Sequence, residues 1–155
     1  MNEVAEKKYV RQTAPYSCCQ LVSLFNAQVF YGQEPHPQEG EEFEALVDLV
    51  KCRHGAAIAI EKAYAKLGYA LQAFTDTDFM GICRNLHEGR PVEFAGFHKT
   101  RGFHSFLVVD VQDQHLHITG WNDDEDVSKV TLEEFLECLP EKGNRNRRMY
   151  AIIRR

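Results

Sequence analysis

Two adjacent cysteines, Cys18 and Cys19, stand at the start of an apolar-periodic segment, shortly after Gln12. A cysteine in the first turn of a helix lies at the positive end of the helix dipole, which favours the thiolate that acyl-transfer chemistry uses. Gln12 precedes Cys18 by six residues across a proline-containing turn, so its amide and the Cys18 N–H could both donate to an oxyanion. We therefore expect Cys18 to be the nucleophile. Cys19 points about 100° around the helix and is expected to form the wall of the site.

His104 is the candidate base among the seven histidines of the chain. It opens the run His104-Ser-Phe-Leu-Val-Val, and a base at the end of a rigid strand is held within reach of a nucleophile. Asn122 and Asp123 follow the next strand-like run, residues 115–121. If the two runs pair as a hairpin, either side chain could accept a hydrogen bond from the second ring nitrogen. The same stretch, WNDDED, is also typical of a turn, and His104 alone would equally suit a hydrogen-bonded core histidine.

Hydrophobic periodicity predicts the elements that position these residues. Helical spacing is expected from an N-cap at Ser17 onwards, then over residues 43–50, 60–67, 79–86 and 131–139, the last opening with the capping box of Thr131 and Glu134. Strands are expected over residues 91–97, 103–111, 115–121 and 149–153, with a short edge strand at 70–74. Helices first and an antiparallel sheet second predict an α+β fold, in which N-terminal helices pack on a C-terminal sheet.

Length, charge and cysteine usage exclude several classes of protein. The 155 residues predict one domain, residues 1–155, and the net charge of −5 argues against binding to nucleic acid or to an anionic membrane surface. No apolar run approaches the roughly 20 residues of a membrane-spanning helix, and no secretory signal is visible. Five scattered cysteines without a C-x-x-C pair predict reduced thiols and no structural metal. We expect a cytoplasmic protein without a cofactor, or an effector delivered by a route that needs no signal.

In order and spacing, Gln12, Cys18, His104 and the Asn/Asp pair resemble a papain-like cysteine peptidase. More narrowly, the chain resembles the double-glycine leader peptidase family, the protease domains of bacteriocin exporters, and its stand-alone relatives. Two further motifs match that family: the strand start Gly89-Arg-Pro-Val92 and the helix start Thr131-Leu-Glu-Glu-Phe135. The similarity runs from about residue 9 to residue 153.

The resemblance implies a papain-like fold with Cys18 as nucleophile, His104 as base and Gln12 as oxyanion donor. Asn122 is the best match for the orienting residue, and Asp123 is the second choice. The chain departs from the family where Cys19 replaces the usual glycine after the nucleophile and where the usual Asp-Pro is missing. We expect a free-standing member, without the exporter domain that follows in the transporters.

The implied activity is that of a thiol-dependent acyl hydrolase, a cysteine peptidase acting on a peptide or protein substrate. The same group of residues would support glutamine deamidation or acyl transfer to an amine. Some relatives keep the fold, lose catalysis and bind peptides, but the presence of Cys18 and His104 favours an active site. A redox sensor is a further interpretation of the tandem cysteines, although no other cysteine lies nearby in the sequence to resolve a sulfenic acid.

Overall fold

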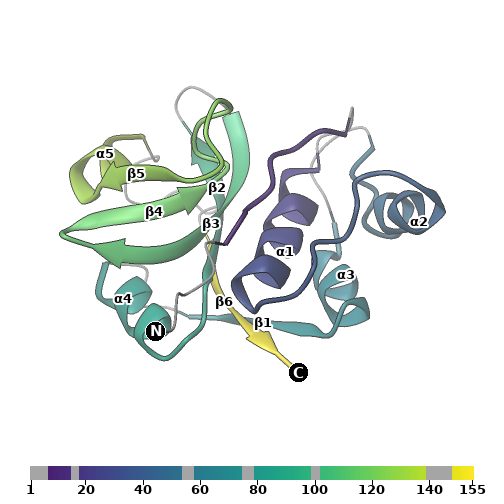
Figure 1. Ribbon diagram of the computed structural model, residues 1–155, viewed down its shortest axis with the longest axis horizontal. Helices are drawn as coiled ribbons and strands as arrows, with labels where there is room; N and C mark the ends of the chain where they lie inside the picture. The colour runs from purple at the N-terminus through teal and green to yellow at the C-terminus, as the bar shows by residue number, and fades with distance from the viewer. Residues whose placement is uncertain (1–6, 15–17, 54–57, 75–78, 99–101, 139–147) are drawn as a thin grey trace, which may run out of the picture.

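The computed structural model describes residues 7–14, 18–53, 58–74, 79–98, 102–138 and 148–155. None of the helices in these ranges has the length and apolarity needed to cross a bilayer. The elements follow one another as shown in Figure 1: α1 (Cys19–Phe30), α2 (Glu41–Val50), α3 (Ile60–Lys66), β1 (Tyr69–Ala73), α4 (Phe79–His87), β2 (Val92–His98), β3 (Gly102–Gln112), β4 (His115–Thr119), β5 (Ser128–Thr131), α5 (Leu132–Cys138) and β6 (Arg148–Arg154).

The strands form one antiparallel sheet in the order β1-β6-β2-β3-β4-β5. The predicted edge strand is confirmed as β1, and the predicted hairpin is confirmed as β3 and β4. The sequence did not predict β5, whose four residues, SKVT, are too few and too polar to show a clear period of two. The α+β fold class expected from the order of the elements is confirmed.

The central strand β3 supplies side chains to two separate apolar clusters. Leu107 and Val109 belong to the cluster formed with α1, α2 and α3, which we call the helical cluster. Phe106 and Val108 belong to the cluster formed with α4 and α5, which we call the sheet cluster. This division follows from the alternation of side chains along a strand. In Figure 1, α1, α2 and α3 are grouped together, apart from α4 and α5.

The helices bury the faces that periodicity predicts, with differences at their ends. The expected N-cap Ser17 lies outside the described residues, and Cys18 is the residue that precedes α1. One of the two bonds of the predicted capping box of α5 is confirmed, because the Glu134 N–H donates to Thr131 Oγ1 at 3.0 Å. The expected burial of Leu136 is wrong: it is 51% exposed, whereas Phe135 on the same short helix is buried. A helix of seven residues presents few side chains to the sheet, and Phe135 occupies that position.

Candidate active site

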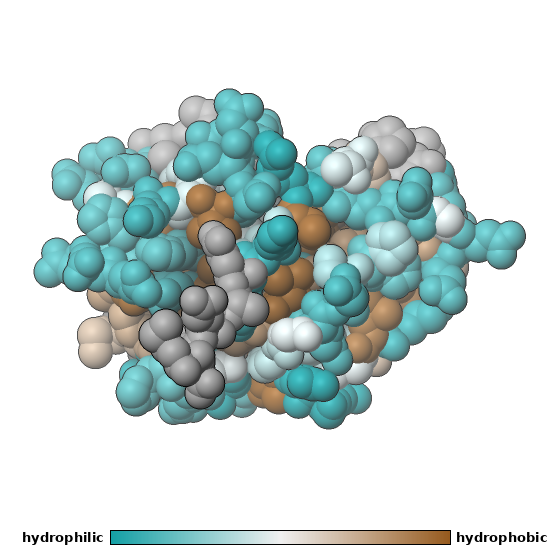
Figure 2. Space-filling view, in the orientation of Figure 1, coloured by the Kyte–Doolittle hydropathy of each residue, from teal (hydrophilic) through white to brown (hydrophobic). Residues whose placement is uncertain are grey.

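A pocket of about 160 Å³ lies where the first turns of α1 meet the start of β3 and the turn after β4. Figure 2 shows apolar side chains along the boundary between the helical part and the sheet part of the molecule. The pocket brings together most of the predicted site residues, but Cys18 is not among those that line it. Its lining residues are Val10, Arg11, Gln12, Cys19, Val22, Ser23, His104, Ser105, Thr119, Gly120, Asn122 and Asp123.

Cys18 lies in the helical cluster and not at the pocket. It is 1% exposed, and its Sγ lies 2.9 Å from Sγ of Cys52. Burial, with a further contribution from the contact with Cys52, raises the pKa of the Cys18 thiol far above its usual range. The structure therefore differs from the expectation of a thiolate at Cys18. Successive side chains at the start of a helix point in directions about 100° apart, so only one of the two cysteines can face the sheet.

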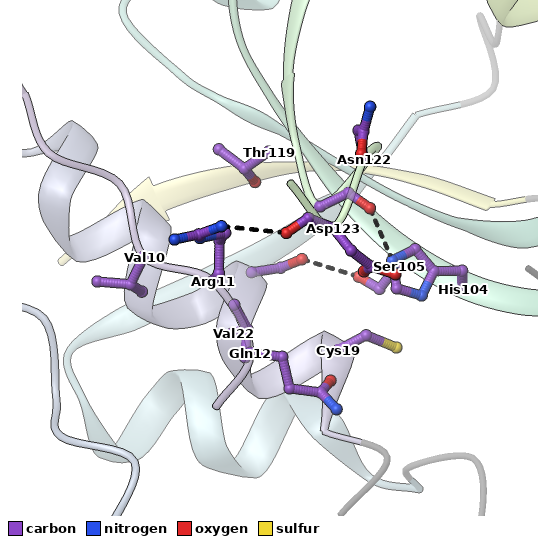
Figure 3. Close-up of a pocket in the computed structure, with 12 residues that line it drawn as sticks. Val10, Arg11, Gln12, Cys19, Val22, His104, Ser105, Thr119, Asn122 and Asp123 are labelled. Carbon is purple, nitrogen blue, oxygen red and sulfur yellow. Dashed lines mark hydrogen bonds between the residues drawn. The ribbon is translucent and has the colours of Figure 1, made fainter. Parts of the chain in front are cut away.

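Cys19, expected to form the wall of the site, is the cysteine that lines the pocket. It is the first residue of α1 and is half-buried. In Figure 3 its sulfur projects toward the imidazole ring of His104, and the side chain of Gln12 lies on the neighbouring side. The first turn of α1 also presents backbone N–H groups that have no partner within the helix itself. A thiol, an imidazole, an amide and a helix N-terminus thus share one small pocket.

Gln12 is held at this pocket by hydrogen bonds made by its neighbours. The backbone of Val10 exchanges two hydrogen bonds with the buried side chain of Asn26 on α1, at 2.7 and 3.0 Å. Gln38 donates to the Arg11 carbonyl at 2.7 Å and accepts from the Thr13 N–H at 2.9 Å. In Figure 1 this N-terminal segment runs between α1 and the sheet. The segment has no regular secondary structure, so these side-chain bonds define its path past the pocket.

His104 occupies the expected position at the start of β3, and a backbone carbonyl fixes the orientation of its ring. Its Nε2 lies 2.9 Å from the carbonyl oxygen of Gly120, which can only accept a hydrogen bond. In the neutral ring Nε2 therefore carries the proton, which leaves Nδ1 as an acceptor. The ring also packs edge-on against Phe106, with 4.7 Å between the ring centroids. In Figure 3 the Cys19 sulfur and the dashed hydrogen bond of His104 lie on opposite sides of the imidazole ring.

Asn122 lines the pocket, but its side chain is part of the turn that follows β4. Its Oδ1 accepts from the Asp124 N–H at 3.0 Å, and its Nδ2 donates to Glu125 at 3.3 Å. Figure 3 shows the Asn122 amide directed away from His104. Asp123 also lines the pocket, and its carbonyl oxygen accepts from Arg11 at 3.2 Å. The sequence allowed two interpretations of Asn122, an orienting residue for His104 or part of a turn. In the structure its side chain bonds within the turn.

A buried polar chain beneath the pocket has no counterpart among the residues named from the sequence. Ser23 on α1 and Ser105 on β3 both line the pocket, and their hydroxyl oxygens are 3.0 Å apart. Ser105 donates to Glu93 Oε1 at 2.6 Å, and Glu93 on β2 is 3% exposed. Burial raises the pKa of Glu93 to about 7, although the bond from Ser105 acts in the opposite direction.

Two signals in the sequence could have indicated these additional residues. Glu93 stands between Val92 and Phe94 in a run that otherwise reads as a buried strand, and a carboxyl there is unusual. Gly120 directly follows β4 and begins the turn, where its φ of +79° is a conformation that favours glycine. Neither signal reveals which atom these residues contact.

Comparison with known proteins supports the fold but gives no relative in sequence. No protein-family model matches the chain, and no curated protein sequence is similar to it. Among solved structures, the chain is similar to the peptidase domain of Streptococcus ComA, described as a bi-functional ABC transporter involved in a quorum-sensing pathway. The TM-score is 0.70 at 18% sequence identity, over 97% of this chain and 100% of the other.

The chain therefore has a papain-like cysteine-peptidase fold. The predicted resemblance to the double-glycine leader peptidases, the protease domains of exporters, is confirmed at the level of the fold, because the similar structure is the peptidase domain of an ABC transporter.

Proposed function

We propose that the chain is a thiol-dependent acyl hydrolase, a cysteine peptidase in which Cys19 is the nucleophile and His104 the base. One observation carries this proposal: Cys19, His104 and Gln12 line the same pocket at the N-terminus of α1. The buried Cys18, which lies outside the pocket, lacks the access to substrate that a nucleophile needs. The interval from Gln12 to the nucleophile is then seven residues instead of six.

The reaction begins with a proton transfer between these two side chains. His104 Nδ1 takes the proton from the Cys19 thiol while Nε2 stays bonded to the Gly120 carbonyl. The Cys19 sulfur then attacks the substrate carbonyl carbon, and the C=O π electrons move onto the oxygen. The Gln12 amide and the N–H groups of the first turn of α1 stabilise that oxyanion.

The tetrahedral intermediate collapses when His104 gives its proton to the leaving amine and the C–N bond breaks. The acyl group is now a thioester on Cys19. His104 next takes a proton from water, the hydroxyl group attacks the thioester, and the free acid leaves as the proton returns to the sulfur. Gly120 has the orienting role that the sequence assigned to Asn122 or Asp123. Its carbonyl stabilises the imidazolium by accepting from it throughout the cycle.

The proposal is tested by alkylation with limiting iodoacetamide between pH 4 and 9, with each cysteine followed by mass spectrometry. Cys19 is expected to label fastest below pH 7 and to lose that advantage in His104→Ala. His117→Ala is the matched control, because His117 lies on β4 and is not a lining residue of the pocket. Faster labelling of Cys18 than of Cys19 would identify Cys18 as the nucleophile. Equal labelling of Cys19 and Cys83 would favour a peptide-binding domain without catalysis.

A second experiment identifies the bond that reacts. The wild-type chain and Cys19→Ala are incubated with a mixed peptide library, and the products are analysed by mass spectrometry. New peptide termini that depend on Cys19 indicate hydrolysis of a peptide bond. A gain of about one mass unit without cleavage indicates glutamine deamidation on the same site, and a mass gain from an added amine indicates acyl transfer.

A further inference from the structure

Cys18, the neighbour of the pocket cysteine Cys19 in the sequence, contacts a second thiol, that of Cys52. Cys18 precedes α1, and Cys52 follows α2 by two residues, 34 positions further along the chain. Their sulfur atoms are 2.9 Å apart, and the two residues are 1% and 0% exposed. A sulfur–sulfur bond is about 2.0 Å long, so a movement of about 1 Å would allow the bond to form.

The surroundings of the pair suit a thiol pair that can be oxidised. Cys52 is held by a bond from its N–H to the Val47 carbonyl at 3.3 Å, which fixes it relative to α2. The guanidinium of the next residue, Arg53, acts on Cys18 in the direction that lowers its pKa and so favours the thiolate. Burial has the larger effect, raises the pKa of Cys18 and keeps that thiol neutral at rest. The pair is thus placed for reaction but is slow to react without an oxidant that can reach it.

We propose that Cys18 and Cys52 form a disulfide when the protein meets a small peroxide such as hydrogen peroxide, while the pocket cysteine Cys19 stays outside the bond. The structure supplies the partner for Cys18 that the sequence alone did not show. A bond between Cys18 and its immediate neighbour Cys19 would require a strained ring, whereas Cys52 approaches from a separate segment. This inference does not depend on the proposed peptidase activity.

The oxidation balances in two steps. The Cys18 sulfur, after losing its proton, attacks one oxygen of hydrogen peroxide, the O–O bond breaks, and the departing hydroxide takes up a proton to give water. The Cys52 sulfur then attacks the resulting sulfenic acid at Cys18. The S–S bond forms, the S–O bond breaks, and the hydroxide leaves with the Cys52 proton as a second water. Two thiols and one peroxide give one disulfide and two waters.

The bond would connect the start of the helix that carries Cys19 to the end of α2. Because it closes a loop of 34 residues, it would restrict the unfolded chain and raise Tm by roughly 5–15 °C. Reduction with dithiothreitol would reverse the increase.

The test is peptide mapping of the full chain after brief treatment with hydrogen peroxide, with the remaining thiols blocked by iodoacetamide. Trypsin gives one peptide with both Cys18 and Cys19, residues 12–51, and the dipeptide Cys52-Arg53. We expect these two peptides to be joined in the wild type and in Cys19→Ser, but not in Cys18→Ser. Cys83→Ser is the matched control and should keep the link, because Cys83 lies on α4.

Three results would overturn the proposal. The first is the absence of the joined peptides in the wild type at a peroxide concentration that oxidises Cys19. The second is a link that persists in Cys18→Ser, since that would join Cys19 to Cys52. The third is a joined species whose Tm equals or falls below that of the reduced chain. If a cysteine variant does not fold, fragment-ion spectra of the joined wild-type peptides decide the question. The iodoacetamide label should then be on Cys19, and a label on Cys18 would overturn the proposal.

Discussion

At the scale of single residues, the pocket combines groups whose effects can be separated by experiment. Gln12, Cys19 and His104 differ in the step at which each would act, and Glu93 lies beneath them as a buried carboxyl. Oxyanion stabilisation affects only reactions that pass through a tetrahedral intermediate, whereas nucleophile activation affects every reaction of the thiol. The burial of Glu93 affects the stability of the fold and its dependence on pH.

Replacement of Gln12 by alanine should slow peptide hydrolysis about 10²–10³-fold, because one donor to the oxyanion is lost. The rate at which iodoacetamide labels Cys19 should stay unchanged, since alkylation forms no oxyanion. Both rates are measured on the same preparation, with any peptide that the wild type cleaves. Thr13→Ala is the control. Residue 13 bonds to Gln38 through its backbone N–H, which alanine keeps, so both rates should match the wild type. An equal loss of both rates in Gln12→Ala would argue that Gln12 acts by positioning Cys19.

Glu93 should make the folded state less stable as the pH rises from about 4.5 to about 7. Its pKa is about 7 in the folded state and near 4.5 in the unfolded chain, so the folded state holds more protons between these values. Stability therefore falls with rising pH in this window, by up to about 3 kcal/mol, and is constant above it. Urea unfolding at pH 4.5, 6 and 8 should show this fall in the wild type and not in Glu93→Gln.

The control for this measurement is Glu133→Gln, because Glu133 is exposed on α5. This variant should reproduce the pH profile of the wild type. Parallel profiles for Glu93→Gln and the wild type would show that the pKa of Glu93 is the same in the folded and in the unfolded chain.

At the scale of elements, the turn after β4 places a backbone carbonyl beside the candidate base His104. Gly120 directs its carbonyl to His104 because its backbone adopts a φ of +79° at the end of the strand. A Cβ at this position would lie 3.5 Å from His104 Nε2, an ordinary contact, so the cost of a side chain comes from the backbone angle. The main candidate for orienting the base is thus a backbone atom whose position depends on a glycine.

Gly120→Ala should lower the free energy of unfolding by about 1–2 kcal/mol, and it should also slow the labelling of Cys19. The second effect follows because a shifted carbonyl at residue 120 no longer holds His104 in one orientation. Gly32→Ala is the matched control: its φ is +80° and an added methyl group would meet nothing within 4 Å, but it is not a lining residue of the pocket. It should lose similar stability at an unchanged labelling rate. A normal labelling rate in Gly120→Ala would show that the carbonyl of residue 120 does not orient His104.

At the scale of the whole molecule, β3 couples the two apolar clusters through alternate side chains. Leu107 is fully buried in the helical cluster, and its neighbour Phe106 is fully buried in the sheet cluster. Because one strand contributes to both, neither cluster can lose its packing without disturbing the other. The pocket lies at the junction, so its geometry depends on both parts of the molecule.

We therefore expect the chain to unfold in one cooperative transition. Trp121, the single tryptophan, packs against Phe106 and Phe135 in the sheet cluster, and its fluorescence reports on that part. Its denaturation curve should coincide with that of far-UV circular dichroism. Leu107→Ala, a change on the opposite side of β3, should lower the free energy of unfolding obtained from both curves by about 2–5 kcal/mol. A shift in circular dichroism with an unchanged tryptophan curve would show that the two clusters unfold separately.

Sequence patterns predict the described elements apart from β5, the order of helices and sheet, and the presence of Gln12 and His104 in the candidate site. Periodicity encodes which faces are apolar, and those faces are buried in the fold. β5 has only four residues, too few to show the alternation that marks a strand in the sequence. Which of the two adjacent cysteines faces the pocket becomes clear only in the folded chain. That choice depends on how α1 is rotated against the sheet, and two neighbouring cysteines look alike in a sequence.

The same reason applies to the contacts between distant segments. The meeting of Cys18 with Cys52 and the chain from Ser23 through Ser105 to Glu93 each join residues from different elements. The carbonyl of Gly120 is a backbone atom, which every residue possesses, so no residue type marks it for this role. Local patterns decide what each segment becomes, whereas the docking of segments decides which atoms meet.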